Sequence, residues 1–364
     1  MGEYYAIFVL AKRHYRDYCL RAGVVSRQEK HREREIMNVP RCGCRRCVLN
    51  VGLLLLALSL PQVLLAQWKA SVGAQNKDLG RQALAFLPNE IWIHEGDSVT
   101  WTFTTAEIHT VSFLQAGQVR LPFQVGCPGV MVNNASFDGS SCVTTPPLVS
   151  GQTFTVQFPV RGNYKLVCLV HENMTGVVHV LEPAATLPLR QSDYDELAAQ
   201  EKTKLLADAD NDQKETSAHH HFANAVRAGT GEVVATAGGK DSLSVMRFLN
   251  DTVVIHAGET AEWTNQDPIT PHTITFGIEP ANPLPPSANV TIDADGARHA
   301  TITSVFDSVH SGFIIAAPED RIGLPQAPVG VTRFRITFTK AGAYPYICAL
   351  HDDLGMVGKV IVLP

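Results

Sequence analysis

The chain has 364 residues, of which 45% are hydrophobic and 18% are charged, and its formal net charge is −5. This length predicts two or three domains, and the hydrophobic fraction excludes a largely disordered chain. A single long uncharged apolar run excludes a polytopic membrane protein. The charge is divided unevenly, because residues 1–47 carry a net +6 and the residues from Gln67 onward carry −11. Such an acidic body argues against nucleic acid as a partner.

The N-terminal region has the order of a secretory signal. Val51–Leu60 is an apolar core inside a longer uncharged stretch, basic residues precede it, and Ala66 is a small residue at a plausible cleavage point. The alternative is an uncleaved membrane anchor, so membrane contact is expected only through this leader. We expect residues 1–66 to be the leader, with translation starting at Met1 or Met37. Export then places the protein in the periplasm or another extracytoplasmic, oxidising compartment.

The rest of the chain contains an internal repeat. Residues 86–102 (FLPNEIWIHEGDSVTWT) match residues 248–264 (FLNDTVVIHAGETAEWT) at a constant offset of 162. Residues 162–171 (GNYKLVCLVH) later match residues 342–351 (GAYPYICALH) at an offset of 180, which indicates inserted loops between retained strands. Each copy has short alternating stretches rich in β-branched and aromatic residues, punctuated by Gly and Pro. This pattern predicts a β-sandwich or barrel.

The repeat divides the chain into four expected parts. These are a leader (1–66), a first β domain (67–184), a partly helical linker (185–240) and a second β domain (241–364). In the linker, Ser192–Asp195 has an S-x-x-D capping pattern followed by helix-favouring composition, so we expect one or two helices. The linker also contains His219–His221. A solvated polar stretch is favoured over a metal site there, because adjacent residues do not share a helix face.

The second copy ends in residues with metal-ligand chemistry. Cys348 and His351 are three residues apart, Met356 follows five residues later, and His272 lies 76 residues before the cysteine. Two imidazoles, one thiolate and a weak axial thioether form the trigonal ligand set of a blue-copper electron-transfer site. The soft sulfur ligands suit Cu(I), and imidazole suits both oxidation states.

The first copy contains the same four residue types in the same order. They are His109, Cys168, His171 and Met174, with the methionine only three residues after the second histidine. A lone C-x-x-H motif is weak evidence, and a lone methionine is usually a core residue. The recurrence of all four at matching places in a repeat therefore predicts one metal site in each copy.

Both copies resemble cupredoxins, the family that includes plastocyanin and amicyanin. CALHDDLGMVGKVIV (Cys348–Val362) is similar to the plastocyanin ligand loop, C-x-x-H-x-x-x-x-M-x-G, and CLVHENMTGVV (Cys168–Val178) is similar to the shorter amicyanin loop. The resemblance implies an all-β protein of two Greek-key β-sandwich domains with one copper each, two per chain. It assigns the eight residues named above as the copper ligands.

The resemblance also implies roles for residues around the ligands. The histidine of each ligand loop, His171 or His351, is expected to reach the surface within an apolar patch and to serve as the electron port. Asn265 is expected to support the second site, whereas Phe103 occupies the corresponding place in the first copy.

Two further cysteines, Cys127 and Cys142, lie in a Gly/Asn/Ser-rich loop of the first β domain. In an exported domain they are expected to form a disulfide. On the chain-entropy model, closing a loop of this length stabilises the fold by about 3 kcal/mol.

These observations predict an exported electron carrier that cycles between Cu(II) and Cu(I), with no catalytic residues. Its partner is expected to be a redox protein such as a cytochrome c or another electron carrier, and the acidic body favours a basic one. One alternative is an enzyme of the multicopper oxidase or copper nitrite reductase kind, which needs His-x-His pairs and a His-Cys-His arrangement. Neither Cys168 nor Cys348 is flanked by histidine, and His-x-His occurs only in His219–His221. Copper storage or delivery is a second alternative.

Overall fold

Strands and one long helix make up the described part of residues 65–364, which belong to one unit. The structure, a computed structural model, describes residues 65–120, 127, 129–130, 134–218, 224–316 and 331–364. The predicted leader, apart from its last two residues, and the His219–His221 stretch lie outside the described residues. Within the described part of the chain, no helix combines the length and the apolar composition needed to cross a membrane.

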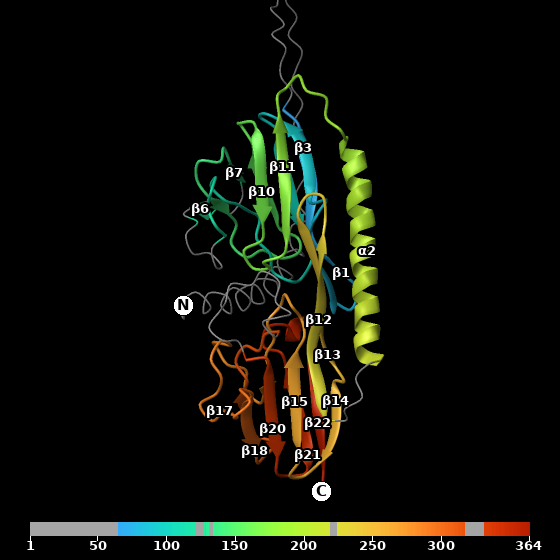
Figure 1. The fold of residues 1–364 in the computed structure, drawn as a ribbon, viewed down its shortest axis with the longest axis vertical. Helices are drawn as coiled ribbons and strands as arrows, with labels where there is room; N and C mark the ends of the chain where they lie inside the picture. Colours follow the sequence, from blue (N-terminus) through green and yellow to red (C-terminus); the bar gives the residue numbers. More distant parts are fainter. Residues whose placement is uncertain (1–64, 121–126, 128, 131–133, 219–223, 317–330) are drawn as a thin grey trace, which may run out of the picture. The chain divides into compact units, whose positions relative to one another are not determined.

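The unit contains two β-sandwiches and one long helix (Figure 1). The strands of the first sandwich are β1 (Gln67–Gln75), β2 (Arg81–Leu87), β3 (Glu90–His94), β4 (Ser98–Phe103), β5 (Ser112–Phe113), β6 (Gly129–Val130), β7 (Asn134–Ser136), β8 (Val143–Thr144), β9 (Thr153–Gln157), β10 (Gly162–Val167) and β11 (Thr175–Leu181). The helix is α2 (Gln191–Ala218). The second sandwich contains β12 (Ala225–Ala235), β13 (Lys240–Leu249), β14 (Thr252–His256), β15 (Thr260–Asn265), β16 (Thr275–Phe276), β17 (Thr291–Ile292), β18 (Arg298–Ile302), β19 (Val309–His310), β20 (Arg333–Phe338), β21 (Gly342–Ile347), a short 3₁₀ helix η1 (Asp352–Leu354) and β22 (Val357–Leu363).

The two sandwiches have the same strand pairing. In the first, one layer has the order β2-β1-β4-β9-β7 and the other the order β3-β11-β10-β5-β8. In the second, the layers are β13-β12-β15-β20-β18-β17 and β14-β22-β21-β16-β19. The all-β fold of two cupredoxin-type Greek-key domains is thereby confirmed.

Alternation along the strands places the cores between the layers. In β4, Val99, Trp101 and Phe103 are buried, while Thr102 is exposed. Successive side chains of a strand point to opposite faces, so a stretch with this pattern buries one face only. Trp263 takes the place of Trp101 in β15 and packs against aromatic rings of β16, β20 and β21. Outside the strands, Cys127 and Cys142 form a disulfide in the loop region between β5 and β8.

The segment expected to be a linker, residues 185–240, contains a strand of the second sandwich. Strand β12 pairs in parallel with β15 and antiparallel with β13, just as β1 pairs with β4 and β2. The second sandwich therefore begins well before residue 241. The repeat is weak in this strand, because Ala, Gly and Val carry little sequence-specific signal.

The helix begins one residue before the expected capping pattern. The Asp193 carboxylate accepts a hydrogen bond from the Arg190 N–H at 2.8 Å, so Asp193 rather than the Ser192–Asp195 pair supports the first turn. The helix packs on β1, β2, β12 and β13, and it buries Tyr194 and Leu205 against them. It thus contacts strands from both sandwiches.

The two sandwiches share a continuous sheet. Edge strands β2 and β13 pair antiparallel, with Leu84 opposite Ser242 and Arg81 opposite Val245. Next to this seam, Arg247 donates to the carbonyl oxygens of Asp78 in the first sandwich (2.5 Å) and Leu354 in the second (2.7 Å). Backbone pairing and this shared cation fix the two domains to each other.

Candidate metal centres

The first cluster lies at one end of the first sandwich and consists of His109, Cys168 and His171. The two Nδ1 atoms are 3.1 Å apart, and each lies 3.9 Å from the Cys168 Sγ. All three side chains are buried. Met174, the fourth predicted ligand, is 0% exposed and follows in the same loop.

Backbone hydrogen bonds hold this geometry. His109 exchanges two hydrogen bonds with Leu148, at 3.0 and 2.9 Å. Cys168 directly follows β10, its N–H donates to the Met174 carbonyl (2.9 Å), and the Met174 N–H donates to the His171 carbonyl (3.1 Å). The ligand loop is therefore a closed turn that places thiol, imidazole and thioether together.

The second cluster has the same construction from His272, Cys348 and His351. The two Nδ1 atoms are 3.2 Å apart, and the Cys348 Sγ lies 3.9 Å from His272 and 3.4 Å from His351. The Met356 N–H donates to the His351 carbonyl (3.1 Å), and the Met356 carbonyl accepts from the Cys348 N–H (3.0 Å). Met356 is 0% exposed. The two extra residues of this loop are accommodated by η1.

Both clusters fit a metal ion with two nitrogen ligands and one sulfur ligand. In each, the point equidistant from the three donor atoms lies about 2.1 Å from every one of them, which is close to the length of metal–imidazole and metal–thiolate bonds. Two imidazoles, a thiolate and a nearby thioether are the donor set of blue-copper sites. The structure thus brings six predicted ligands into two donor triangles.

In each cluster one threonine, which was not predicted from the sequence, connects the segment of the first histidine to the cysteine loop. Thr110 Oγ1 accepts from the Leu169 N–H (2.8 Å), and Thr273 Oγ1 accepts from the Ala349 N–H (2.7 Å). The backbone N–H of each threonine also points at the cysteine sulfur, at 3.4 and 3.3 Å. The signal was present, because a threonine follows the first histidine in both copies. Such donors to a thiolate stabilise its negative charge.

Two glycines make room for the first histidine of each cluster. Gly73 (φ +67°) and Gly229 (φ +78°) lie at irregularities in the β1–β2 and β12–β13 pairings. A Cβ on Gly73 would lie 2.7 Å from His109 Nε2, and one on Gly229 would lie 2.2 Å from His272 Nε2. These bulge glycines therefore permit the histidine rings to approach the backbone.

The outer environments of the two clusters differ. In the second, Asp267 Oδ2 lies 3.5 Å from His272 Nε2, and both side chains are fully buried. Within the described residues, the Nε2 atoms of both His109 and His272 are buried without a formed hydrogen bond, so the clusters differ in the presence of this nearby carboxylate. A carboxylate behind a ligand histidine raises its basicity and fixes its tautomer. Only the second cluster has this support for its first histidine.

This difference changes the proton states of the metal-free clusters. Burial, and then His171, hold the pKa of His109 well below its ordinary value, and burial raises the pKa of the Cys168 thiol. Burial also acts to lower the pKa of His272, but contacts with Asp267 and Cys348 outweigh it and raise that pKa to about 9. In Cys348, contact with His272 outweighs burial and lowers the thiol pKa. Charge on the histidine and on the thiol is thus disfavoured in the first cluster, whereas the contacts of the second cluster oppose the effect of burial on both groups.

Asn265 fastens the backbone around His272. Its amide donates to the carbonyls of Thr270 (3.0 Å) and Ile314 (2.9 Å), and its carbonyl accepts from the Asp267 N–H (2.7 Å). It is 2% exposed, and Phe103 fills the corresponding place with apolar contacts. Asn265 therefore acts on the segment that carries His272 rather than on a ligand directly.

We expect Asn265→Ala to destabilise the second sandwich by about 1–3 kcal/mol, because three buried backbone groups lose their partner. Urea denaturation of the metal-free chain, followed by tryptophan fluorescence, measures this change. Phe103→Leu is the matched control, since it removes no hydrogen bond and should weaken the first sandwich only by the loss of packing. An Asn265→Ala variant as stable as the parent chain would contradict the assigned role.

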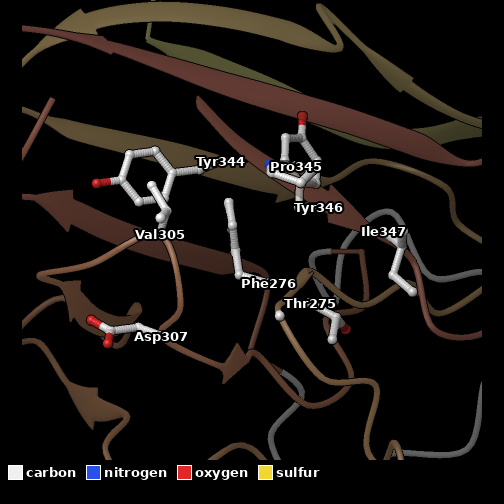
Figure 2. A pocket seen from close by; sticks show the side chains of 9 residues that line it. Thr275, Phe276, Val305, Asp307, Tyr344, Pro345, Tyr346 and Ile347 are labelled. Carbon is white, nitrogen blue, oxygen red and sulfur yellow. The ribbon is translucent and has the colours of Figure 1, made fainter. Parts of the chain in front are cut away.

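The second domain also has a pocket that is separate from the ligand cluster (Figure 2). It is lined by residues of β16, β21 and the loop before β19, among them Phe276, Tyr344 and Tyr346. None of the predicted ligands lines it. The metal centres are thus interior sites formed by ligand loops, not the floor of this pocket.

Comparison with known proteins agrees with this donor chemistry. A family model described as copper binding proteins of the plastocyanin/azurin family matches residues 74–181 and 233–363. The chain belongs to the plastocyanin/azurin family. Amicyanin-alpha of Methylorubrum extorquens is 33% identical over 97 residues, which is 27% of this chain and 65% of amicyanin-alpha. The chain thus spans slightly less than two thirds of that relative.

Two further proteins were found by the comparison. Plastocyanin of Ginkgo biloba is 27% identical over 99 residues, covering 27% of this chain and 88% of the plastocyanin. A solved structure of a multicopper oxidase is 14% identical and covers 82% of this chain and 87% of the oxidase, with a TM-score of 0.21.

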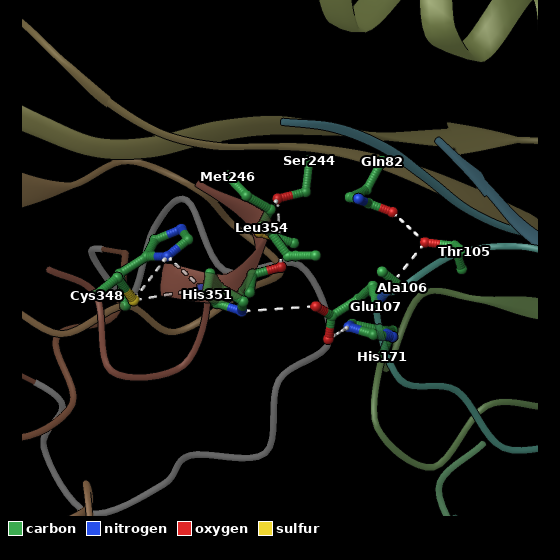
Figure 3. Close-up of polar contacts among 12 residues, drawn as sticks. Gln82, Thr105, Ala106, Glu107, His171, Ser244, Met246, Cys348, His351 and Leu354 are labelled. Atoms are coloured by element: carbon green, nitrogen blue, oxygen red, sulfur yellow. Dashed lines mark hydrogen bonds and ion pairs between the residues drawn. The ribbon is translucent and has the colours of Figure 1, made fainter. Parts of the chain in front are cut away.

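One expectation taken from the plastocyanin/azurin family is wrong here. His171 and His351 were expected at the surface as electron ports, but each is only 3% exposed. Their Nε2 atoms point toward the same carboxylate, that of Glu107 (Figure 3). Sequence repeats cannot show that the ligand ends of two domains face each other, so this arrangement was not predictable.

Proposed function

We propose that this chain is an exported electron-transfer protein with a type 1 copper site in each domain. The observation that carries the proposal is the pair of buried donor triangles, each with a methionine in the same short loop. The proposed ligands are His109, Cys168, His171 and Met174 in the first domain and His272, Cys348, His351 and Met356 in the second. Copper bound there would supply a one-electron couple, Cu(II)/Cu(I).

The protein's contribution is to hold the ligands rigidly. Each first histidine is fixed by a two-hydrogen-bond backbone bridge, and each cysteine by the loop that returns from its methionine. Buried, close-packed surroundings resist rearrangement. Ligands that keep one geometry in both oxidation states suit rapid electron exchange, and burial keeps small molecules from reaching the centre.

The proposed location is outside the cytoplasm, in the periplasm or an equivalent compartment. The apolar core Val51–Leu60 supports an export signal, and the Cys127–Cys142 disulfide is of the kind that persists in oxidising compartments. The proposed partner is a soluble redox protein, such as a cytochrome c. The chain's similarity to amicyanin-alpha and plastocyanin and its own two C-x-x-H ligand loops support this role.

Enzymatic oxidase or nitrite reductase activity is the second candidate, since such enzymes also combine cupredoxin domains. It needs additional histidine ligands for a catalytic copper, and the sequence has neither a His-Cys-His phrase nor a His-x-His phrase apart from His219–His221. Electron transfer therefore remains the better-supported function. Copper storage or delivery uses the same ligands and differs only in exchange rate and reduction potential.

Copper stoichiometry with single-cysteine variants tests the proposal. The parent chain is expected to bind two coppers and to show the intense visible absorption of a thiolate–copper bond. Cys168→Ser and Cys348→Ser should each remove one copper and the absorption of that site, because the thiolate is the ligand that produces it. The matched control is the Cys127→Ser/Cys142→Ser double variant, which should keep both. Two unchanged coppers in Cys348→Ser would refute the assignment.

A further inference from the structure

One carboxylate lies between the two candidate metal centres. Glu107, in the loop between β4 and β5, is 4% exposed. Its Oε1 is 3.6 Å from the Nε2 of His171, and its Oε2 is 3.9 Å from the Nε2 of His351 (Figure 3). The first ring belongs to the same domain as Glu107 and the second ring belongs to the other domain. One carboxylate oxygen therefore faces a ligand histidine of the first centre, and the other oxygen faces a ligand histidine of the second centre.

The ring atoms that face Glu107 are not those that face the clusters. In both rings Nδ1 points at the other histidine and the cysteine of its own cluster, which leaves Nε2 on the opposite side of the ring. When Nδ1 serves as a ligand, the proton of a neutral imidazole must be on Nε2. An acceptor on that side selects this tautomer and fixes the ring plane. Glu107 offers such an acceptor to both rings.

Glu107 is itself held by buried polar groups. Its N–H donates to Thr105 Oγ1 (3.1 Å), and Thr105 Oγ1 hydrogen-bonds Gln82, which is 0% exposed and lies in β2. Strand β2 is the one that pairs with β13 of the second domain. The loop that carries the carboxylate is thus attached to the strand that forms the seam between domains.

The repeat shows that this arrangement is specific to one copy. Two residues before the first ligand histidine, the first domain has Glu107 and the second has Thr270. The Thr270 side chain is directed elsewhere, because its Oγ1 donates to Ser244 Oγ at 3.4 Å. A single carboxylate therefore serves a pair of centres, which is a feature of the two-domain chain rather than of either domain alone.

We propose that Glu107 is a positioning residue shared by both metal centres, which holds the Nε2–H groups of His171 and His351 and so presents Nδ1 of each to the metal. The present distances exceed a hydrogen bond, and the carboxylate tightens onto the rings when Nδ1 is engaged and Nε2–H becomes a stronger donor. This inference rests on metal binding at the two clusters, as in the proposed function. It adds that a residue of the first domain controls the metal affinity of the second centre.

The test measures metal affinity one centre at a time in the full-length chain. Cys348→Ser isolates the first centre and Cys168→Ser isolates the second, and competition titration with Cu(I) gives the affinity of each. Glu107→Leu removes both acceptors at similar volume and is expected to weaken both centres about 10–100-fold, the usual effect of losing an outer-shell partner. Glu107→Gln has only one acceptor oxygen, so it can support at most one ring and should weaken at least one centre tenfold.

A second readout and a control separate positioning from general destabilisation. In the Zn(II)-loaded, ¹⁵N-labelled chain, the Nε2–H resonances of His171 and His351 should both shift in Glu107→Leu. Asp97→Asn is the control, because Asp97 is a buried carboxylate of the same domain that contacts Trp68 and the His94 backbone instead. It should lower stability but leave both affinities unchanged.

The outcomes are distinct. Weakening confined to the first centre, or parent-like affinity at both centres in Glu107→Gln, overturns the shared role. A parent chain that binds fewer than two metal ions overturns the proposed function instead. Loss at both centres together with shifts of both Nε2–H resonances supports the inference.

Discussion

Gly229→Ala is expected to abolish metal binding at the second cluster and to leave the first cluster loaded. The new methyl group would lie 2.2 Å from Nε2 of His272 and 2.8 Å from its Cδ2, so the ring must leave its place. His272 is 0% exposed and lies against the bulge, so its ring can move only by displacing its packed neighbours. Because His272 is one of three strong donors, its displacement breaks the donor triangle. A copper count of one per chain measures this result.

Backbone strain alone must be separated from this effect. Alanine at φ +78° costs about 1–2 kcal/mol whatever surrounds it. Gly296→Ala is the matched control, because Gly296 has φ +81° and a Cβ there meets no atom within 4 Å. The control should lose similar stability and keep two coppers. If both variants lost the same amount of copper, the steric explanation would be wrong.

The ligands of both metal centres could be predicted, because their types and spacing form a recognisable pattern in the sequence. Cys, His and Met lie within one loop, and this loop recurs in the second copy with the first histidine in a recurring phrase. The sandwich class could also be predicted from the alternation of apolar and polar residues along the strands, because burial of one face imposes a period of two. The repeat then established that both domains share a topology.

The supporting structure was less predictable because it depends on pairing between distant strands. Gly73 and Gly229 lie in strands whose small residues carry little periodic signal, and their role appears only when the histidine ring is seen beneath them. Strand β12 was assigned to the linker for the same reason. The position of Glu107 between two rings depends on how β2 and β13 pair, and neither copy of the repeat contains that information alone.

The seam itself contains buried acids, which gives the protein a pH-dependent stability. Asp241, in β13, is 2% exposed and accepts a hydrogen bond from the Asn89 amide of the first domain at 3.0 Å. Burial, and then the charge of Glu201 in α2, raise the pKa of Asp241 to about 7. Burial raises the pKa of Glu201 to about 7 as well. Two carboxyl groups between the helix and the shared sheet are thus ionised only near neutral pH.

The sign of the effect follows from the direction of these shifts. A carboxyl group whose pKa is higher in the folded state than in the unfolded state binds its proton more tightly when folded. Its stabilising contribution is complete below the unfolded pKa of about 4 and is lost as pH rises through about 7. The free energy of unfolding should therefore fall by roughly 2–4 kcal/mol between pH 4 and pH 8 on account of Asp241.

Asp241→Asn is expected to remove this dependence and to exceed the parent chain in stability at pH 8. Asparagine retains an acceptor oxygen for Asn89 and has no charge to bury, so the two chains should be equally stable near pH 4 and diverge above pH 5. Urea denaturation of the metal-free proteins across this range measures the difference, in which the titration of groups not coupled to Asp241 cancels and that of Glu201 does not. The exposed Asp251→Asn is the control and should change nothing. A parallel pH profile for Asp241→Asn and parent would contradict the prediction.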